Sequence, residues 1–92
     1  MASELILVVE DEPDTQDALR DILVTEGYEV VITSSGREAL VFLANCTPDL
    51  IVLDLMLPDV SGIEVCQRAR EQSYVPIIML TARRSPTDKV LG

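Results

Sequence analysis

Three segments of this chain are continuous apolar runs that each end at an oxygen-bearing side chain. The runs cover residues 5–9, 50–53 and 77–80, and they are followed by Glu10 with Asp11, by Asp54 and by Thr81. Apolar runs this short and unbroken are typical of strands that are buried on both faces of a parallel sheet. Because ligands bind at the carboxyl ends of the strands in an open parallel sheet, we expect these side chains to meet at one functional site.

The composition restricts the chain to one small domain and excludes several classes of function. The 92 residues are 48% hydrophobic, which is enough for a core and argues against disorder. A net charge of −9 argues against direct nucleic-acid contact by this segment. The sequence has no His, which excludes Ser-His and Cys-His catalysis, and its two Cys are too few for a disulfide framework.

No targeting or membrane segment is visible in the sequence. No apolar run approaches the roughly 18 residues that a membrane helix needs. The N-terminus has no basic region ahead of its apolar stretch, unlike a signal peptide. We therefore expect a cytoplasmic protein without membrane contact.

Helical patterns alternate with the apolar runs. The predicted strands are residues 5–9, 28–33, 49–53 and 77–80, and the predicted helices are residues 14–26, a segment that begins at the capping-box pattern of residues 35–38, and residues 62–72. Gly27 is a suitable end for the first helix. Right-handed crossovers between successive strands then give an α/β layered fold.

Each predicted helix has a set of apolar residues that we expect to face the sheet. These are Ala18, Leu19, Ile22 and Leu23 in the first helix; Ala39, Leu40, Phe42 and Leu43 in the second; and Ile63 and Cys66, with Val65 and Ala69 as further candidates, in the third.

A fourth helix start is present close to the end of the chain. Ser85 is a suitable N-cap, Pro86 suits the first helical position, and Asp88 is an acid in the first turn. The chain reaches Gly92 about one and a half turns later, which is too short for a stable isolated helix. We therefore expect residues 1–92 to form one domain that is cut in its fourth helix or completed by a partner.

The predicted cluster of Glu10, Asp11 and Asp54 suggests phosphoryl chemistry. Carboxylates held close together repel each other, and a hard divalent cation such as Mg²⁺ removes that repulsion. An exposed aspartate beside the cation could then attack phosphorus and become an acyl phosphate, while Thr81 hydrogen-bonds a phosphoryl oxygen. Single carboxylates at strand ends are often only solvated loop residues. Three strands that end in register on oxygen ligands favour a site.

Three motifs resemble the receiver domain of two-component response regulators, and the resemblance extends over the whole chain. The motifs are residues 6–12 (ILVVEDE), 48–62 (PDLIVLDLMLPDVSG) and 76–82 (PIIMLTA). The resemblance implies a flavodoxin-like, doubly wound parallel sheet with strand order 2-1-3-4. It also implies that the family's fifth strand, fifth helix and fifth-strand Lys are absent from these residues, so that phosphoryl transfer would be weakened.

The resemblance also implies a role for each site residue. Asp54 matches the phosphoacceptor, which receives a phosphoryl group from a sensor histidine kinase or a phosphotransfer protein. Asp11 matches the direct Mg²⁺ ligand, and Glu10 matches its acidic neighbour. The backbone carbonyl of Met56 matches a further metal ligand. Thr81 matches the hydroxyl that moves toward the phosphoryl group on activation.

Two other classes of function remain open from the sequence. A phosphatase of the haloacid-dehalogenase type also uses an Asp nucleophile, but it needs a second acid two residues later, where this chain has Met56. A receiver-shaped interaction module without phosphorylation is the other alternative. Metal-dependent phosphorylation separates the receiver from the interaction module, and turnover of a phosphomonoester would select the phosphatase.

Two expectations concern partners. With the fifth strand absent, residues 77–80 would form a hydrophobic sheet edge, which predicts a homodimer through that edge or an exposed helix surface. Residues 82–86 (ARRSP) resemble the branch of the family whose output domain is a transcription factor, and that domain would lie outside these residues.

Overall fold

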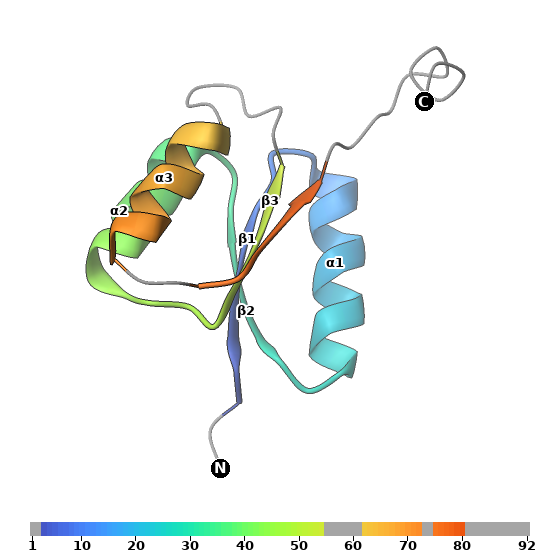
Figure 1. The fold of residues 1–92 in the computed structure, drawn as a ribbon. Helices are drawn as coiled ribbons and strands as arrows, with labels where there is room; N and C mark the ends of the chain where they lie inside the picture. Colours follow the sequence, from blue (N-terminus) through green and yellow to red (C-terminus); the bar gives the residue numbers. More distant parts are fainter. Residues whose placement is uncertain (1–2, 55–61, 73–74, 81–92) are drawn as a thin grey trace.

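A four-stranded parallel sheet forms the centre of the structure (Figure 1). The computed structural model describes residues 3–54, 62–72 and 75–80. Its elements are β1 (Leu5–Val9), α1 (Pro13–Thr25), β2 (Glu29–Thr33), α2 (Gly36–Asn45), β3 (Leu50–Asp54), α3 (Gly62–Gln72) and β4 (Ile77–Leu80). The strand order is β2-β1-β3-β4, which confirms the predicted doubly wound, flavodoxin-like arrangement. The predicted start of a fourth helix at Ser85 lies outside the described residues.

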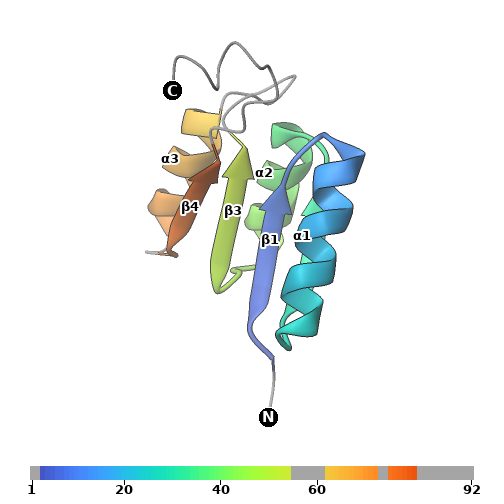
Figure 2. The same ribbon diagram turned by 90° about the vertical axis from the view of Figure 1, so that its right-hand side faces the viewer.

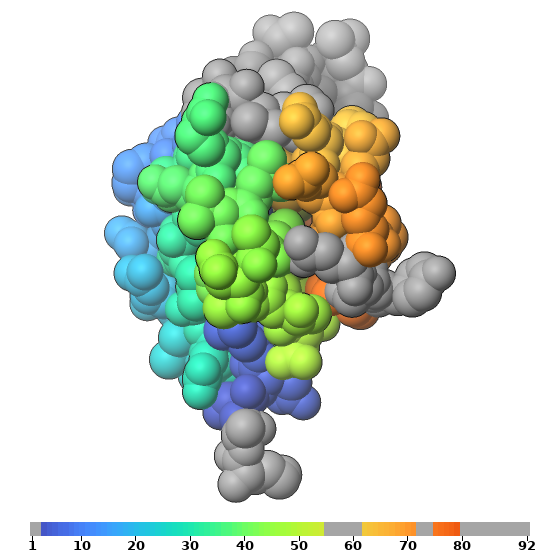
Figure 3. Space-filling model, turned by 90° about the vertical axis from the view of Figure 1, so that its left-hand side faces the viewer, coloured from blue at the N-terminus to red at the C-terminus, as the bar shows by residue number. Residues whose placement is uncertain are grey.

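Helices cover the sheet on both faces. α1 lies on one face, and α2 and α3 lie together on the other (Figures 1 and 3). The larger apolar cluster is on the side of α2 and α3 and includes Leu7, Val9, Ile51 and Leu53 of the strands. Ile6, Val8 and Val52 form the smaller cluster under α1. The alternation of the two sets along β1 and β3 explains why these strands read as unbroken apolar runs.

The ends of α1 follow from two special residues. Pro13 occupies the first helical turn, where its missing N–H costs no hydrogen bond. Gly27 adopts a φ of 96°, and the amides of Gly27 and Tyr28 donate to the carbonyls of Val24 and Leu23, which completes a Schellman motif. The helix therefore spans 13–25, one residue earlier at each end than predicted.

Half of the predicted apolar face of α1 is exposed. Leu19 and Leu23 pack against the smaller cluster, as expected. Ala18 and Ile22 do not, and Ile22 is 60% exposed. Positions four residues apart lie on one line of a helix, while the preceding residue is rotated by about 100°. A single line of side chains therefore contacts the sheet, and the prediction for Ala18 and Ile22 was wrong.

The sheet-facing side of α3 agrees with the prediction for Cys66 but not with that for Ile63. Val65 and Ala69 are buried in the larger cluster, and the half-buried Cys66 packs against it, as predicted. Ile63, in contrast, is 55% exposed. Val65 and Ala69 are again four residues apart and therefore lie on the same face of the helix. Val65, Cys66 and Ala69, rather than Ile63, therefore face the sheet.

Strand boundaries differ from the prediction by one residue. β2 begins at Glu29 and β3 at Leu50, and β3 includes Asp54 as its last residue. None of the described helices is long and apolar enough to cross a lipid bilayer.

Candidate functional site: an acidic cluster at the carboxyl end of the sheet

The carboxyl ends of β1, β3 and β4 lie at the same end of the sheet (Figure 2). Glu10 and Asp11 follow β1, and Asp54 ends β3, whose Leu53 lies opposite Val9 in the register. One carboxylate oxygen from each of Glu10, Asp11 and Asp54 lies within 4.8 Å of the other two. The predicted meeting of these three side chains is confirmed.

The three acids differ in exposure. Glu10 and Asp54 are fully buried, and Asp11 is exposed. The expectation that the phosphoacceptor candidate is exposed was therefore wrong. Asp54 is the last residue of the interior strand β3 and lies opposite Leu80 of β4 in the register. Buried carboxylates that lie together cost free energy unless a counter-charge or hydrogen bonds stabilise them.

Hydrogen bonds hold Glu10 in the turn between β1 and α1. Its backbone amide donates to the Thr33 carbonyl of β2 at 3.0 Å, which continues the β1–β2 pairing by one residue. Its carboxylate oxygen Oε2 accepts from the Glu12 amide at 2.9 Å. This bond satisfies a donor close to the N-terminus of α1, where a negative charge is also favourable.

Gln16 is a site residue that the sequence analysis missed. Its Nε2 atom donates to the Glu10 carbonyl at 2.5 Å and to the Ser34 hydroxyl oxygen at 3.2 Å. A polar residue in the first turn of the helix that follows an acidic strand end was the available signal. That signal is weak, because first-turn positions of helices are commonly polar.

The connection between β2 and α2 carries a modified capping box. The Ser35 hydroxyl accepts from the Glu38 amide at 3.1 Å, as predicted. The Glu38 carboxylate, however, accepts from the amide of Ser34 at 2.7 Å rather than from that of the N-cap residue. Ser34 is thereby held to the first turn of α2 and beside Gln16.

Two predicted site residues, Met56 and Thr81, lie outside the described residues. Thr81 comes directly after Leu80, which pairs with Asp54 in the register of β4 and β3. The backbone carbonyl of Met56, predicted as a metal ligand, is two residues beyond Asp54 in the sequence.

The donor set of the cluster fits Mg²⁺. All three groups are hard carboxylate oxygens, and no His or Cys is among them. Mg²⁺ usually takes one or two carboxylates and keeps several waters or phosphate oxygens. One exposed carboxylate, Asp11, beside two buried ones is compatible with that mixture.

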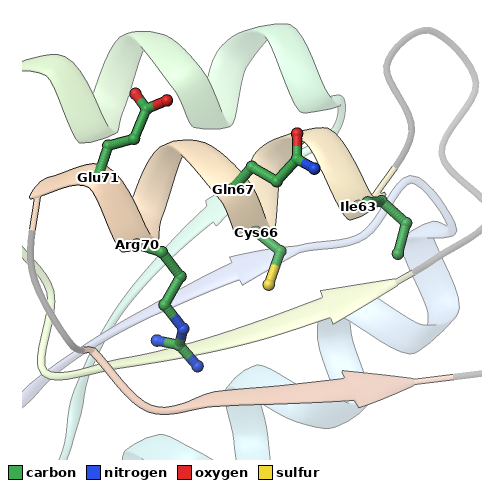
Figure 4. A pocket seen from close by; sticks show the side chains of 5 residues that line it. All are labelled: Ile63, Cys66, Gln67, Arg70 and Glu71. Carbon is green, nitrogen blue, oxygen red and sulfur yellow. The ribbon is translucent and has the colours of Figure 1, made fainter.

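A pocket of about 450 Å³ lies elsewhere, along α3. It is lined by Ile63, Cys66, Gln67, Arg70 and Glu71 (Figure 4). Figure 4 shows Cys66 and Arg70 pointing toward the strands, and the Arg70 guanidinium donates to the Val75 carbonyl. None of the three clustered acids lines this pocket, so it is separate from the acidic site.

Comparison with known proteins identifies the family. The sequence profile of the response regulator receiver domain matches residues 6–91. The chain is 51% identical over 87 residues to the uncharacterized transcriptional regulatory protein YrkP of Bacillus subtilis, covering 95% of this chain and 37% of that protein. It is 45% identical over 87 residues to the DNA-binding response regulator MtrA of Mycolicibacterium smegmatis, covering 95% of this chain and 38% of MtrA. The chain thus belongs to the response regulator receiver domain family and spans little more than a third of these relatives.

Solved structures give the same result for the fold. The receiver domain of sensor histidine kinase PA1611 from Pseudomonas aeruginosa, which has a magnesium ion coordinated in its active site cleft, matches with a TM-score of 0.83 and 33% identity over 97% of this chain and 75% of that one. The chemotaxis response regulator CheY4 of Vibrio cholerae matches with a TM-score of 0.83 and 33% identity over 99% of this chain and 78% of that one.

Proposed function

We propose that this chain is the phosphoryl-accepting switch of a two-component response regulator, with Asp54 as the phosphoacceptor. The observation that carries the proposal is the cluster of Glu10, Asp11 and Asp54 at the carboxyl end of the sheet. One carboxylate oxygen of each lies within 4.8 Å of the other two. An Asp carboxylate is a known nucleophile toward phosphorus. The family to which the chain belongs supplies the reaction class.

In the proposed reaction, a carboxylate oxygen of Asp54 attacks the phosphorus of a phosphohistidine on a histidine kinase or a phosphotransfer protein. The new O–P bond forms as the P–N bond breaks, and the leaving imidazole takes up a proton. Glu10, Asp11, Asp54 and the Met56 carbonyl would hold Mg²⁺, which neutralises the charge of the phosphoryl oxygens. The hydrogen bond from the Glu12 amide at 2.9 Å orients the Glu10 carboxylate within the cluster.

Thr81 is proposed as the hydroxyl that contacts the phosphoryl group after transfer. The register supports this role, since Leu80 lies opposite Asp54 and Thr81 is the next residue in the sequence. The protein acts once per phosphoryl group as a signalling switch rather than as a turnover enzyme, because the position two residues after Asp54 is Met56 and carries no acid.

The full-length protein is proposed to be a transcription regulator in the cytoplasm. YrkP and MtrA are named as a transcriptional regulatory protein and a DNA-binding response regulator, and this chain matches little more than a third of each. The acidic segment itself, with a net charge of −9, is not the part expected to contact DNA.

The test is the intact mass of the chain after incubation with Mg²⁺ and phosphoramidate, whose P–N bond is of the same class as that of phosphohistidine. We expect one phosphoryl adduct that needs Mg²⁺ and is absent in Asp54→Asn. The matched control is Asp49→Asn, which changes an Asp at the opposite end of β3 and should keep the adduct. A folded chain without an adduct would instead select the phosphorylation-deficient interaction module.

A further inference from the structure

Gln16 joins three segments that are distant in the sequence beside the acidic cluster. It belongs to α1, and its amide nitrogen donates to the carbonyl of Glu10 at the end of β1 and to the hydroxyl of Ser34 after β2. Gln16 is half-buried, and an amide nitrogen has two hydrogens, which match these two acceptors. From this geometry we propose that Gln16 is a positioning residue that sets the direction in which Asp11 presents its carboxylate.

The link from Gln16 to Asp11 is the planar peptide bond. The Glu10 carbonyl and the Asp11 amide belong to one rigid peptide unit, so a bond that holds the carbonyl also orients the Asp11 backbone. The next peptide unit is held as well, because the Glu12 amide donates to the Glu10 carboxylate at 2.9 Å. Both peptide units that flank Asp11 are therefore fixed, although the side chain itself is exposed.

Ser34, the second acceptor of Gln16, is itself held by a hydrogen bond. Ser34, which accepts from Gln16, donates its own amide to the Glu38 carboxylate at 2.7 Å. Glu38 lies in the first turn of α2, on the face of the sheet opposite to α1 (Figure 1). The hydrogen bonds through Gln16 thus connect the first turns of α1 and α2 around the carboxyl end of the sheet.

This inference rests on the proposed metal-dependent function of the cluster and adds a residue that would not itself touch the metal. Residues that orient the ligands of a metal typically change its affinity by 10–100-fold when they are lost. Gln16 acts through the backbone of a neighbouring ligand, so we expect an effect at the lower end of that range. Two variants separate the effect of losing the donor hydrogens from the effect of a change in charge. Gln16→Met has a similar length and no donor, and Gln16→Glu has no donor and adds a negative charge.

The first measurement is the Mg²⁺ affinity by isothermal titration calorimetry. We expect the Kd to rise about tenfold in Gln16→Met and also to rise in Gln16→Glu, although an added negative charge alone would lower it. Asp17→Glu, which keeps the charge at the neighbouring exposed position, is the control and should leave the Kd unchanged. Ser34→Ala removes only the weaker of the two bonds and should have a smaller effect. A Kd that stays unchanged in both Gln16 variants, with or without a loss of thermal stability, would overturn the proposal.

The second measurement needs no metal. Hydrogen exchange of the Glu12 amide, followed by NMR in metal-free protein, reports how firmly the backbone around Asp11 is held. We expect exchange at least about fivefold faster in Gln16→Met than in the wild type, without a matching change in the core strands. An unchanged Glu12 rate would overturn the positioning role. A wild-type chain that binds no Mg²⁺ would instead refute the proposed function, and the exchange rate would still decide the role of Gln16.

Discussion

Asp49 and Leu5 are joined by two hydrogen bonds at the end of the sheet opposite to the acidic cluster. The Asp49 amide donates to the Leu5 carbonyl at 2.7 Å, and the Leu5 amide donates to the Asp49 carboxylate at 2.7 Å. Asp49, which directly precedes β3, therefore links the start of this strand to β1 through both its backbone and its side chain.

The first prediction follows from this link. Asp49→Ala removes the acceptor of the Leu5 amide, and we expect the free energy of unfolding to fall by about 1 kcal/mol, since the group is partly solvated. Asp49→Asn keeps an acceptor oxygen in the same place and should lose less than half of that amount. Urea denaturation followed by circular dichroism measures both. Equal stabilities for Asp49→Ala and the wild type would show that the side-chain bond contributes nothing.

The second prediction concerns Mg²⁺ and stability. A ligand that binds only the folded state stabilises it, by about 2.7 kcal/mol at 100 times its Kd. We therefore expect Mg²⁺ to raise the melting temperature of the wild-type chain and to have little effect on Asp11→Ala. Asp14→Asn, an exposed acid in the first turn of α1 outside the cluster, should respond like the wild type. An equal response of Asp11→Ala would mean that the cation binds elsewhere.

The third prediction tests which side of α3 faces the sheet. Val65 is fully buried in the larger cluster, so Val65→Ala should lower the free energy of unfolding by about 2 kcal/mol. Ile63 is 55% exposed, and Ile63→Ala should change it by less than about 0.5 kcal/mol. Chemical denaturation of the two variants measures the difference. A larger loss of stability in Ile63→Ala than in Val65→Ala would instead support the prediction that Ile63 faces the sheet.

The fourth prediction concerns self-association through β4. Ile78 is 51% exposed and Met79 is 43% exposed, and within the described part of the chain β4 pairs only with β3. Exposed apolar side chains along a sheet edge favour pairing with a second copy. Light scattering over a range of concentrations should show a dimer that Ile78→Lys disrupts. The control Val41→Lys changes an apolar residue of α2 that is 62% exposed and should leave association unchanged. A monomer at every concentration would contradict the predicted homodimer.

The architecture could be predicted almost completely from local patterns. The continuous apolar runs ahead of Glu10 and Asp54 identify buried parallel strands, and the handedness of the crossovers restricts their order. Gly27 and the Ser35 cap mark helix ends through backbone chemistry that involves only neighbouring residues. The meeting of the three acids follows from the same strand ends, so it too was predictable.

What only the tertiary structure decided is how side chains from different segments are arranged against one another. The rotation of α1 and α3 about their axes places Leu23 rather than Ile22, and Val65 rather than Ile63, against the sheet. The helical periodicity leaves several such rotations possible, and packing selects one of them. The bonds of Gln16 to Glu10 and Ser34 join residues that are 6 and 18 positions apart, and no local pattern encodes them. The sequence by itself determined which chemical groups lie at the carboxyl end of the sheet. Packing between the helices and strands determined how deeply each of these groups is buried and how it is oriented.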